Sequence, residues 1–218
     1  MQRIGCFHAH YSNIEHIENA LRSLGVELIH YVDPGLDRIK KDADFTTEMA
    51  QKKVLDTLNW IAKSHVDAIL ITCTFFTAIY DENVHRFPIP VIKIDDPLFE
   101  EICQLDQPTI IAFTNPSTVQ GTMNQLAAYA TTKGKVLDAT PALLENTFDL
   151  IMQGKKNEYI EAVTQGLIEV IEANPTKRVI AAQLSMVPAA QAAEKQTKRN
   201  VGNQLDSLAT YMKDVLTL

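Results

Sequence analysis

One cysteine of the chain lies where a thiol could act as a nucleophile or as an acid and base. Cys73 lies between two threonines in the stretch ITCTFF. The preceding run from Asp67 to Thr72 is short and apolar, which is typical of a strand buried on both faces. A second apolar run begins at Phe75, so the sequence predicts that Cys73 lies at the turn from a strand into a helix.

The first turn of a helix favours the charged form of a thiol. Unpaired backbone N–H groups and the positive end of the helix dipole stabilise a thiolate there. A shift of the thiol pKa from ~8.5 to ~7 requires only about 2 kcal/mol, and the hydroxyls of Thr72 and Thr74 could add hydrogen bonds. A cysteine packed in the core is the alternative interpretation, and the residue type alone does not decide between the two.

The other cysteines and the histidines give weaker signals. Cys6 lies in a strand pattern and Cys103 in a helix pattern, so both are predicted to be small buried side chains. Three widely spaced cysteines without a CxxC motif argue against disulfides and against a zinc site. His8 and His10 point to one side of an extended segment, but a pair without a third ligand is a weak metal signal, and no metal site is predicted. Ordinary structural roles are expected for the remaining histidines, which are His16, His30, His65 and His85.

Strand and helix patterns alternate along the chain, which predicts parallel sheets because right-handed crossovers place helices on the sheet faces. Predicted strands cover residues 3–8, 26–33, 67–72 and 91–95 in the first half, and 109–114, 135–139 and 178–183 in the second. The predicted helices cover residues 14–24, 75–85, 141–153 and 158–173. Two more begin at residue 46 or 47 and at residue 117 or 118, and end at residues 63 and 132. A further helix is predicted to begin at residue 97. The residues after Met186 are helical in character, so a fourth strand in the second half would have to be very short.

The polar, proline-broken segment 104–108 predicts a boundary between two lobes. The first lobe would span residues 1–106 and carry Cys73, and the second would span 107–196 and carry Ser185. A C-terminal helix in 197–218 would pack back on the first lobe. The expected fold class is α/β, with two similar lobes, each a short and mainly parallel sheet flanked by helices, and a cleft between them.

Polar side chains gather at the predicted carboxyl ends of the strands, where open parallel sheets bind their ligands. Hydroxyls, amides and the one thiol at these ends could hold a small anion. Asp95 and Asp96 could form a carboxylate pair for acid and base chemistry, or they could cap the helix that opens at Pro97. The predicted substrate-binding residues are His8, Ser12, Thr72, Thr74, Asp95, Thr114, Ser117, Thr118 and Gln183.

The composition restricts the class of partner. The net charge is −7 and no long basic stretch offsets it, so nucleic acid is not an expected partner. No window approaches the ~18 apolar residues of a membrane span, and the N-terminus has no apolar segment of signal-peptide length, so a cytoplasmic location is expected. The glycine-rich motifs that cradle nucleotide phosphates do not occur.

The order of these pieces resembles the aspartate/glutamate/hydantoin racemase superfamily. The resemblance covers most of residues 1–190 and rests on the segments DAILITCT, VIKIDDPLFEE, TIIAFTNPSTVQGTM and RVIAAQLSM. It implies a two-lobed α/β fold in which one cysteine from each lobe flanks the acidic carbon of the substrate. One cysteine removes the proton and the other returns it from the opposite face. Cys73 matches the first of these positions, and the second falls at or near Ser185.

The serine is a departure from the family pattern, because no cysteine follows Cys103. A serine hydroxyl is too weak an acid or base to replace a thiol without an activating partner. The resemblance still implies a racemase-like or isomerase-like enzyme that acts on a small amino acid or carboxylic acid through Cys73, with Ser185 opposite it. It implies no cofactor, because the cysteine bases of this family act directly, and it suggests a homodimer. The alternatives are a one-cysteine decarboxylase or lyase, although the known ones keep the second-lobe thiol, and an inactive protein that binds small carboxylates.

Overall fold

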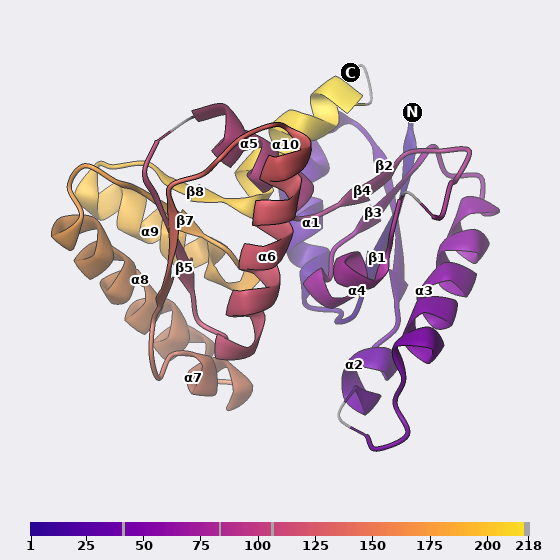
Figure 1. The fold of residues 1–218 in the computed structure, drawn as a ribbon, viewed down its shortest axis with the longest axis horizontal. Helices are drawn as coiled ribbons and strands as arrows, with labels where there is room; N and C mark the ends of the chain where they lie inside the picture. The colour runs from indigo at the N-terminus through magenta and orange to yellow at the C-terminus, as the bar shows by residue number, and fades with distance from the viewer. Residues whose placement is uncertain (41, 83, 106, 216–218) are drawn as a thin grey trace. The chain divides into compact units, whose positions relative to one another are not determined.

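The computed structural model of the chain describes residues 1–40, 42–82, 84–105 and 107–215 (Figure 1). The chain divides into two compact units, Met1–Asp96 with Leu208–Leu218, and Pro97–Ser207. The division therefore falls after Asp96, the first residue of helix α5 (Asp96–Leu105), and not in the segment 104–108. The physical reason is that the apolar side of α5 belongs to the core of the second unit, where Leu98, Phe99 and Ile102 are buried.

The first unit contains a four-stranded parallel sheet with the strand order β2-β1-β3-β4. The central strands β1 and β3 are almost fully buried, as their apolar runs predict. The parallel pairing places Cys6 of β1 beside His30 of β2 on one side and Leu70 of β3 on the other. The strands are β1 (Arg3–His8), β2 (Glu27–Val32), β3 (Ala68–Ile71) and β4 (Val91–Lys93).

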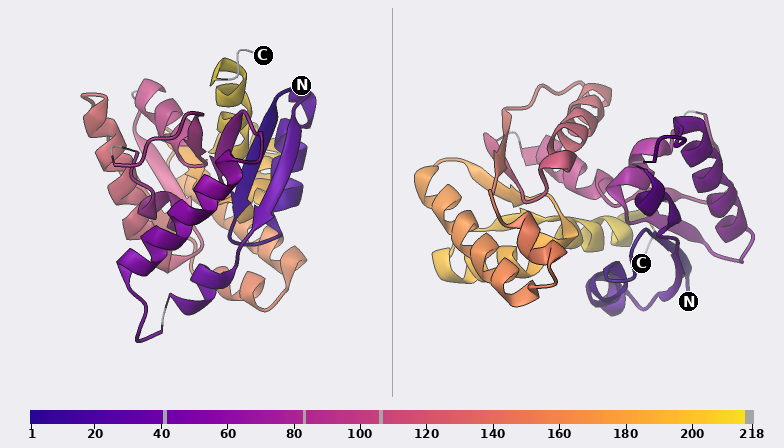
Figure 2. Two further views of the ribbon diagram at one scale, coloured as in Figure 1. Left: turned by 90° about the vertical axis from the view of Figure 1, so that its right-hand side faces the viewer. Right: turned by 90° about the horizontal axis from the view of Figure 1, so that it is seen from below.

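Helices cover both faces of this sheet, with α1 and α3 on opposite sides (Figure 1), and α3 lies in front of the strands in the left view of Figure 2. On α3, the side chains of Val54, Leu58 and Ile61 are fully buried at the spacing of one helix face. The hydroxyl of Thr46 accepts a hydrogen bond from the Met49 N–H and caps this helix, as the sequence predicts. The helices are α1 (Asn13–Leu21) with a 3-10 turn (Arg22–Leu24), α2 (Gly35–Ile39), α3 (Thr47–Ala62) and α4 (Thr74–Ile79).

Helix α4 ends at Ile79, so the prediction of a helix over residues 75–85 is wrong for its second half. Tyr80 leaves the helical conformation, with φ −76° and ψ 118°. Its ring is buried next to that of Phe87, and its hydroxyl donates a hydrogen bond to the carbonyl oxygen of His85. The loop that follows Ile79 therefore buries the Tyr80 ring, where the sequence predicted that the helix would continue.

The second unit repeats the architecture with the strand order β6-β5-β7-β8, again all parallel. The prediction of two parallel sheets flanked by helices is therefore confirmed. Strand β8 has three residues, which agrees with the expectation of a very short fourth strand. The strands are β5 (Thr109–Phe113), β6 (Ala139–Leu143), β7 (Arg178–Ala181) and β8 (Val201–Asn203).

The predicted strand over residues 135–139 is wrong, because β6 begins only at Ala139. Val136, which suggested the strand, is 96% exposed. Pro141 lies inside β6, where its missing N–H is tolerated because β6 is at the edge of the sheet. The predicted helix over 141–153 is correspondingly reduced to α7 (Phe148–Met152).

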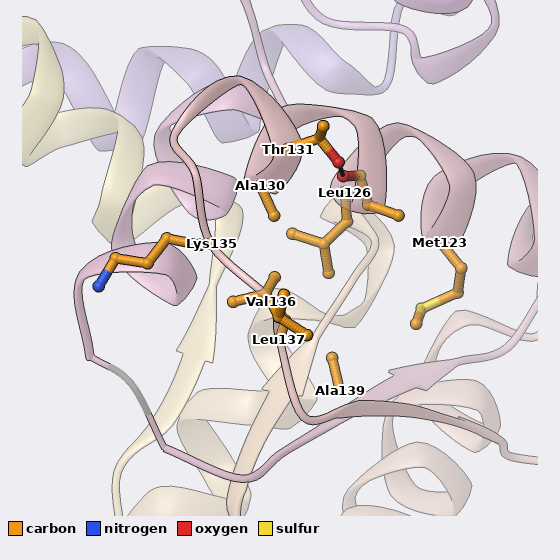
Figure 3. Close-up of a pocket in the computed structure, with 9 residues that line it drawn as sticks. Met123, Leu126, Ala130, Thr131, Lys135, Val136, Leu137 and Ala139 are labelled. Carbon is orange, nitrogen blue, oxygen red and sulfur yellow. Dashed lines mark hydrogen bonds between the residues drawn. The ribbon is translucent and has the colours of Figure 1, made fainter.

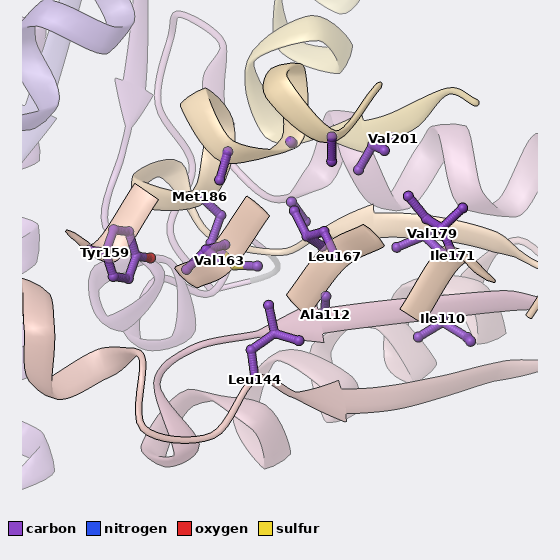
Figure 4. Close-up of a cluster of buried hydrophobic side chains, with 14 residues drawn as sticks. Ile110, Ala112, Leu144, Tyr159, Val163, Leu167, Ile171, Val179, Met186 and Val201 are labelled. Carbon is purple, nitrogen blue, oxygen red and sulfur yellow. The ribbon is translucent and has the colours of Figure 1, made fainter. Parts of the chain in front are cut away.

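A second core cluster of the second unit, besides the one around α5, lies where α8 packs against α9 and the sheet. Figure 4 shows Leu167 and Ile171 of α8 beside Ala112 and Ile110 of β5. The buried alanines of α9 occupy little space, which lets the two helices approach closely. The remaining helices are α6 (Pro116–Thr132), α8 (Lys156–Ala173), a 3-10 turn (Leu184–Met186), α9 (Val187–Thr197) and α10 (Gln204–Val215).

Candidate active site

Cys73 occupies the N-cap position of α4, one residue beyond the buried Thr72 that follows β3. The prediction that this cysteine lies at the turn from strand to helix is confirmed. Its backbone is extended, and its carbonyl oxygen accepts the Thr77 N–H at 2.9 Å. The side chain is half-buried and carries a thiol, not a disulfide. Since α4 has only six residues, the helix dipole acts on this thiol over a shorter length than the sequence predicts.

Thr72 takes part in several hydrogen bonds within the first unit. Its hydroxyl lies 2.8 Å from Nδ1 of His8 and 3.2 Å from the carbonyl oxygen of Phe7. The amide of Asn13, at the start of α1, lies 3.4 Å from both the hydroxyl and the carbonyl oxygen of Thr72. These contacts fix the residue that precedes Cys73.

His8 is fully buried at the end of β1, and both of its ring nitrogens are engaged inside the first unit. Nε2 lies 2.8 Å from Nδ1 of His30, whose Nε2 contacts the carboxylate of Glu18 at 3.0 Å. Burial, together with the neighbouring His30, lowers the pKa of His8 to about 4, so this imidazole is neutral at pH 7. We therefore assign His8 to the support of Thr72.

The other predicted residues of the first unit differ in their surroundings. Ser12 is exposed, and its hydroxyl lies 2.8 Å from Nδ1 of His10. Asp95 is buried, and its carboxylate accepts a hydrogen bond from the hydroxyl of Thr77, which belongs to α4. Thr74 begins α4, and its carbonyl oxygen accepts from the same hydroxyl. Asp95 therefore connects the end of β4 to the helix that follows Cys73.

At the strand ends of the second unit, Gln183 organises the backbone. Its Oε1 accepts hydrogen bonds from the N–H of Thr114 at 2.7 Å, from the hydroxyl of Thr114 at 2.9 Å and from the N–H of Asn115 at 3.2 Å. Gln183 follows β7 and Thr114 follows β5, so this amide ties together two neighbouring strand ends.

Ser185 contacts a tyrosine that the sequence reasoning did not single out. The hydroxyl of Tyr159, on α8, lies 2.9 Å from the Ser185 hydroxyl and 3.1 Å from that of Thr114. Burial raises the pKa of Tyr159 above its ordinary value, while its two hydroxyl contacts act in the opposite direction. The phenol is therefore neutral at pH 7 and can donate or accept a hydrogen bond, but it does not supply the base that a catalytic serine needs.

Ser117 and Thr118 serve the first turn of α6. The N-cap is Asn115 and not Ser117 or Thr118, because Oδ1 of Asn115 accepts the Ser117 N–H at 3.0 Å. The Ser117 hydroxyl contacts the same Oδ1, and the Thr118 hydroxyl donates to the carbonyl oxygen of Asn115. An asparagine followed by proline at the first helical position is the signal that identifies this cap in the sequence.

Two pockets lie in the second unit, and the second of them includes Leu143 and Leu144 at the carboxyl end of β6. Figure 3 shows the first, of about 290 Å³, between α6 residues such as Leu126 and the segment that includes Val136. The second, of about 610 Å³, is lined by residues such as Leu144 and Gly166. No predicted site residue lines either pocket, so neither pocket defines the site.

The fold and the strand ends together define an α/β protein of two parallel four-stranded sheets with polar, hydrogen-bonded carboxyl edges. Among the residues that the structure describes, no helix is long and apolar enough to cross a membrane. No protein-family model matches the sequence, and no curated protein matches it significantly.

Solved structures with this fold include glutamate, aspartate and allantoin racemases. Allantoin racemase from Klebsiella pneumoniae matches with a TM-score of 0.71 and 15% identity over 100% of this chain and 88% of that one. Glutamate racemase RacE1 from Bacillus anthracis matches with a TM-score of 0.69 and 13% identity over 99% and 82%. A candidate Asp/Glu racemase from Yersinia pestis matches with a TM-score of 0.72 and 14% identity over 100% of both chains. The chain therefore shares the fold of these solved racemases, and the fold that the resemblance implies is confirmed.

Proposed function

We propose that this protein is a racemase-like isomerase that acts on a small amino acid or carboxylic acid, with Cys73 as its acid and base. The observation that carries the proposal is the position of the Cys73 thiol. It lies at the carboxyl edge of a parallel sheet, directly after the buried and hydrogen-bonded Thr72, in a fold shared with racemases. Ligands of open parallel sheets bind at this edge.

The proposed reaction begins with removal of the proton on the carbon next to the substrate carboxylate. The C–H bond breaks, the Cys73 thiolate forms an S–H bond, and the electron pair moves onto the carboxylate as an enediolate. Return of a proton from the thiol regenerates the starting enantiomer, whereas a proton delivered from solvent to the opposite face of the enediolate gives its mirror image, and the thiol then loses its proton to solvent. Hydrogen-bond donors near the carboxylate stabilise the developing charge. No cofactor takes part in this proposed sequence.

Ser185 remains a proposed site residue that contacts the substrate, although its hydroxyl must give up its hydrogen bond to Tyr159 in order to donate to a carboxylate. The reason is that the Tyr159 proton goes to Thr114, whose own proton goes to Gln183. The Ser185 hydroxyl and that of Thr114 are both held by Tyr159, so the three hydroxyls form an ordered polar set. A neutral set of this kind suits binding of a carboxylate more than transfer of a proton from carbon. The contact between the hydroxyls of Ser185 and Tyr159 supports a binding role for Ser185.

The test is hydrogen exchange at the α-carbon in D₂O over a panel of small amino acids and carboxylic acids, followed by ¹H NMR and chiral chromatography. The wild-type protein should exchange the α-proton of at least one acid, and Cys73→Ala should abolish that exchange. Cys103→Ala is the matched control, because it removes a buried thiol from α5, and it should keep the activity. Exchange that survives in Cys73→Ala, or no exchange with any acid, would refute the proposal.

A second candidate function is binding of a small carboxylate without turnover. The specific observation in its favour is that the sequence has no cysteine after Cys103, so a second thiol is missing. Stabilisation against heat by an acid that shows no exchange, and that still stabilises Cys73→Ser, would identify this function. Malonate-type acids in the same panel test the one-cysteine decarboxylase alternative through release of CO₂.

A further inference from the structure

We propose that Cys6, His8 and His30 bind one thiophilic divalent cation, for which Zn²⁺ is the natural probe. Each side chain offers one ligand atom, Sγ of Cys6 and a ring nitrogen of each histidine, and these atoms all lie within 4.8 Å of one another. Nε2 of His8 and Nδ1 of His30 face each other at 2.8 Å. The group is separate from the Cys73 thiol, so this inference does not depend on the proposed isomerase activity.

The pleat of the first sheet brings the three residues to one face. Phe7 packs into the core under α3, so its neighbours Cys6 and His8 point to the opposite face, which α1 covers. The parallel register then pairs Cys6 with His30 on the adjacent strand β2. Two strands thus supply all three side chains. Strands are more rigid than loops and therefore hold metal ligands in more precise positions.

The outer nitrogen of each imidazole is held by a partner. Nδ1 of His8 lies 2.8 Å from the Thr72 hydroxyl, and Nε2 of His30 lies 3.0 Å from the carboxylate of Glu18. These contacts turn the other two nitrogens toward each other, at 2.8 Å. A histidine that binds a metal usually has its second nitrogen held in this way by a carboxylate, a carbonyl or water.

Only a small movement is needed for the two nitrogens to share an ion. Zinc–nitrogen bonds of ~2.0–2.1 Å in a tetrahedral site place two nitrogens roughly 3.4 Å apart. The imidazoles would therefore separate by roughly half an ångström, and the hydrogen between them would leave to solvent as the ion enters. The Cys6 thiol makes a long contact, 3.8 Å from its sulfur to the carbonyl oxygen of Ile4, and its proton would also leave to solvent when the sulfur binds the ion.

The donor set selects the type of cation. One thiol and two imidazoles suit Zn²⁺ and related borderline ions, whereas Mg²⁺ and Ca²⁺ prefer oxygen ligands. Three protein ligands leave a fourth position open. Cys6 and His8 are fully buried, but the side chains of His30 and Glu18 are 15% and 45% exposed, so water and the ion can reach the site from this side.

A purely structural hydrogen-bond chain is the competing explanation. The chain from Glu18 through His30 and His8 to Thr72 is complete without an ion. The two explanations differ in the role of Cys6, which takes no part in that chain but must bind the metal directly. They also differ in the role of Glu18. In the hydrogen-bond chain its carboxylate only holds His30, whereas in the metal site it orients His30 for the ion.

Titration of tag-free, chelator-treated protein with Co²⁺ tests the proposal, because a cobalt–thiolate bond gives an intense charge-transfer absorption. We expect one Co²⁺ per chain with this absorption, displacement of the cobalt by Zn²⁺, and no displacement by excess Mg²⁺. Cys6→Ser should lose the charge-transfer band, while Cys103→Ser and Cys73→Ser, each checked for folding by circular dichroism, should keep it. Glu18→Gln should weaken binding by about 10-fold to 100-fold, the usual effect of losing a partner of a histidine ligand.

No cobalt binding at one equivalent would overturn the proposal. A charge-transfer band that persists in Cys6→Ser, or one that disappears in Cys103→Ser, would do the same. If Cys6→Ser fails to fold, Glu18→Gln decides, because its partly exposed carboxylate is not part of the core. Unchanged affinity in that variant would also contradict the inferred geometry.

Discussion

Gly5→Ala is predicted to destabilise the first unit, because α3 packs directly on β1 at this residue. A Cβ atom at Gly5 would lie 2.4 Å from Cγ2 of Ile61, and 3.5 and 3.6 Å from the two methyl carbons of Val66. Two carbon atoms are in optimal contact at about 3.5–4.0 Å, so the first distance is more than about 1 Å too short. Cγ2 is attached to the β-carbon of Ile61, in the last turn of α3, and the χ1 angle of a β-branched side chain in a helix is strongly restricted.

The expected magnitude is the balance of two effects. Inserting a methyl group into a well-packed core costs about 1–3 kcal/mol, and replacing glycine by alanine returns about 0.4–1 kcal/mol by restricting the unfolded chain. The difference runs from about 0 to about 2.6 kcal/mol, and because the contact of 2.4 Å is so short, Gly5→Ala should lower the free energy of unfolding by about 1–2 kcal/mol within this range. With a urea m-value of about 2 kcal/mol/M, the midpoint of unfolding falls by about 0.5–1 M.

The assay is urea unfolding followed by circular dichroism and by the fluorescence of Trp60, the single tryptophan, which lies on α3. Ile61→Leu moves the branch of the side chain one carbon outward, so it should relieve the contact. The double variant should then be less destabilised than the sum of the two single variants, by at least about 0.5 kcal/mol. Gly121→Ala is the matched control, because it lies inside α6 with open space at its Cβ position, and it should stabilise by about 0.5–1 kcal/mol. An unchanged midpoint in Gly5→Ala, or strict additivity in the double variant, would refute the packing argument.

Three further predictions concern hydrogen bonds. Tyr159→Phe removes the hydroxyl that contacts Ser185, and should lower the free energy of unfolding in urea by about 1–2 kcal/mol. The hydrogen bond from Lys133, with one from a tyrosine hydroxyl, lowers the pKa of Glu100 to about 2 from an ordinary 4.5. Because the pKa of Glu100 is lowered on folding, the stabilising contribution of this carboxylate is fully present above pH 4.5 and is lost as the pH falls toward 2. Glu100→Gln should therefore reduce the loss of protein stability between pH 6 and pH 3. Thr46→Ala removes the N-cap of α3 and should cost about 1 kcal/mol, measured by the same urea midpoint. An unchanged urea midpoint in either stability variant, or an unchanged pH dependence in Glu100→Gln, would contradict these predictions.

The elements that sequence patterns predicted well are those whose burial is uniform along the element. β1, β3, β5 and β7 are central strands with nearly continuous apolar sequences, and all four are found where these sequences lie. Helix α3 follows its capping threonine and its regular apolar face. In each case, local pattern and tertiary burial agree.

The errors arose where the tertiary structure overrides the local pattern. Strand β6 contains Pro141, and it forms because β5 offers a pairing edge in register with it, from Thr109 with Ala139 to Phe113 with Leu143. Such an edge strand depends on its neighbour more than on its own propensity. The apolar Val136 belongs instead to the exposed segment before it.

In the candidate site, too, local sequence predicted some positions, whereas others depend on the tertiary structure. The position of Cys73 followed from one strand and the helix after it, so local sequence was sufficient. The positions of His30 and Tyr159 depend on which strands are neighbours and on how α8 is rotated against the sheet. His30 is 22 residues from His8, and Tyr159 is 45 residues from Thr114. No local pattern specifies these pairings, although the register of Cys6 with His30 follows at once when β1 and β2 are known to pair.

Under the proposed function, the chemistry of the two strand-end groups is unequal, and this has a stereochemical consequence. The first unit carries a thiol at its strand end, whereas the second carries the hydroxyls of Ser185, Thr114 and Tyr159, and burial raises the pKa of the tyrosine further. None of these hydroxyls can remove a carbon-bound proton at pH 7 without a base. Cys73 is therefore the proposed base, it returns the proton to the face from which it came, and inversion depends on a proton that comes from solvent to the opposite face. Exchange of the α-hydrogen with deuterium should then proceed much faster than inversion of the configuration. Equal rates of exchange and inversion would require a second acid and base that this serine, this threonine and this tyrosine do not provide.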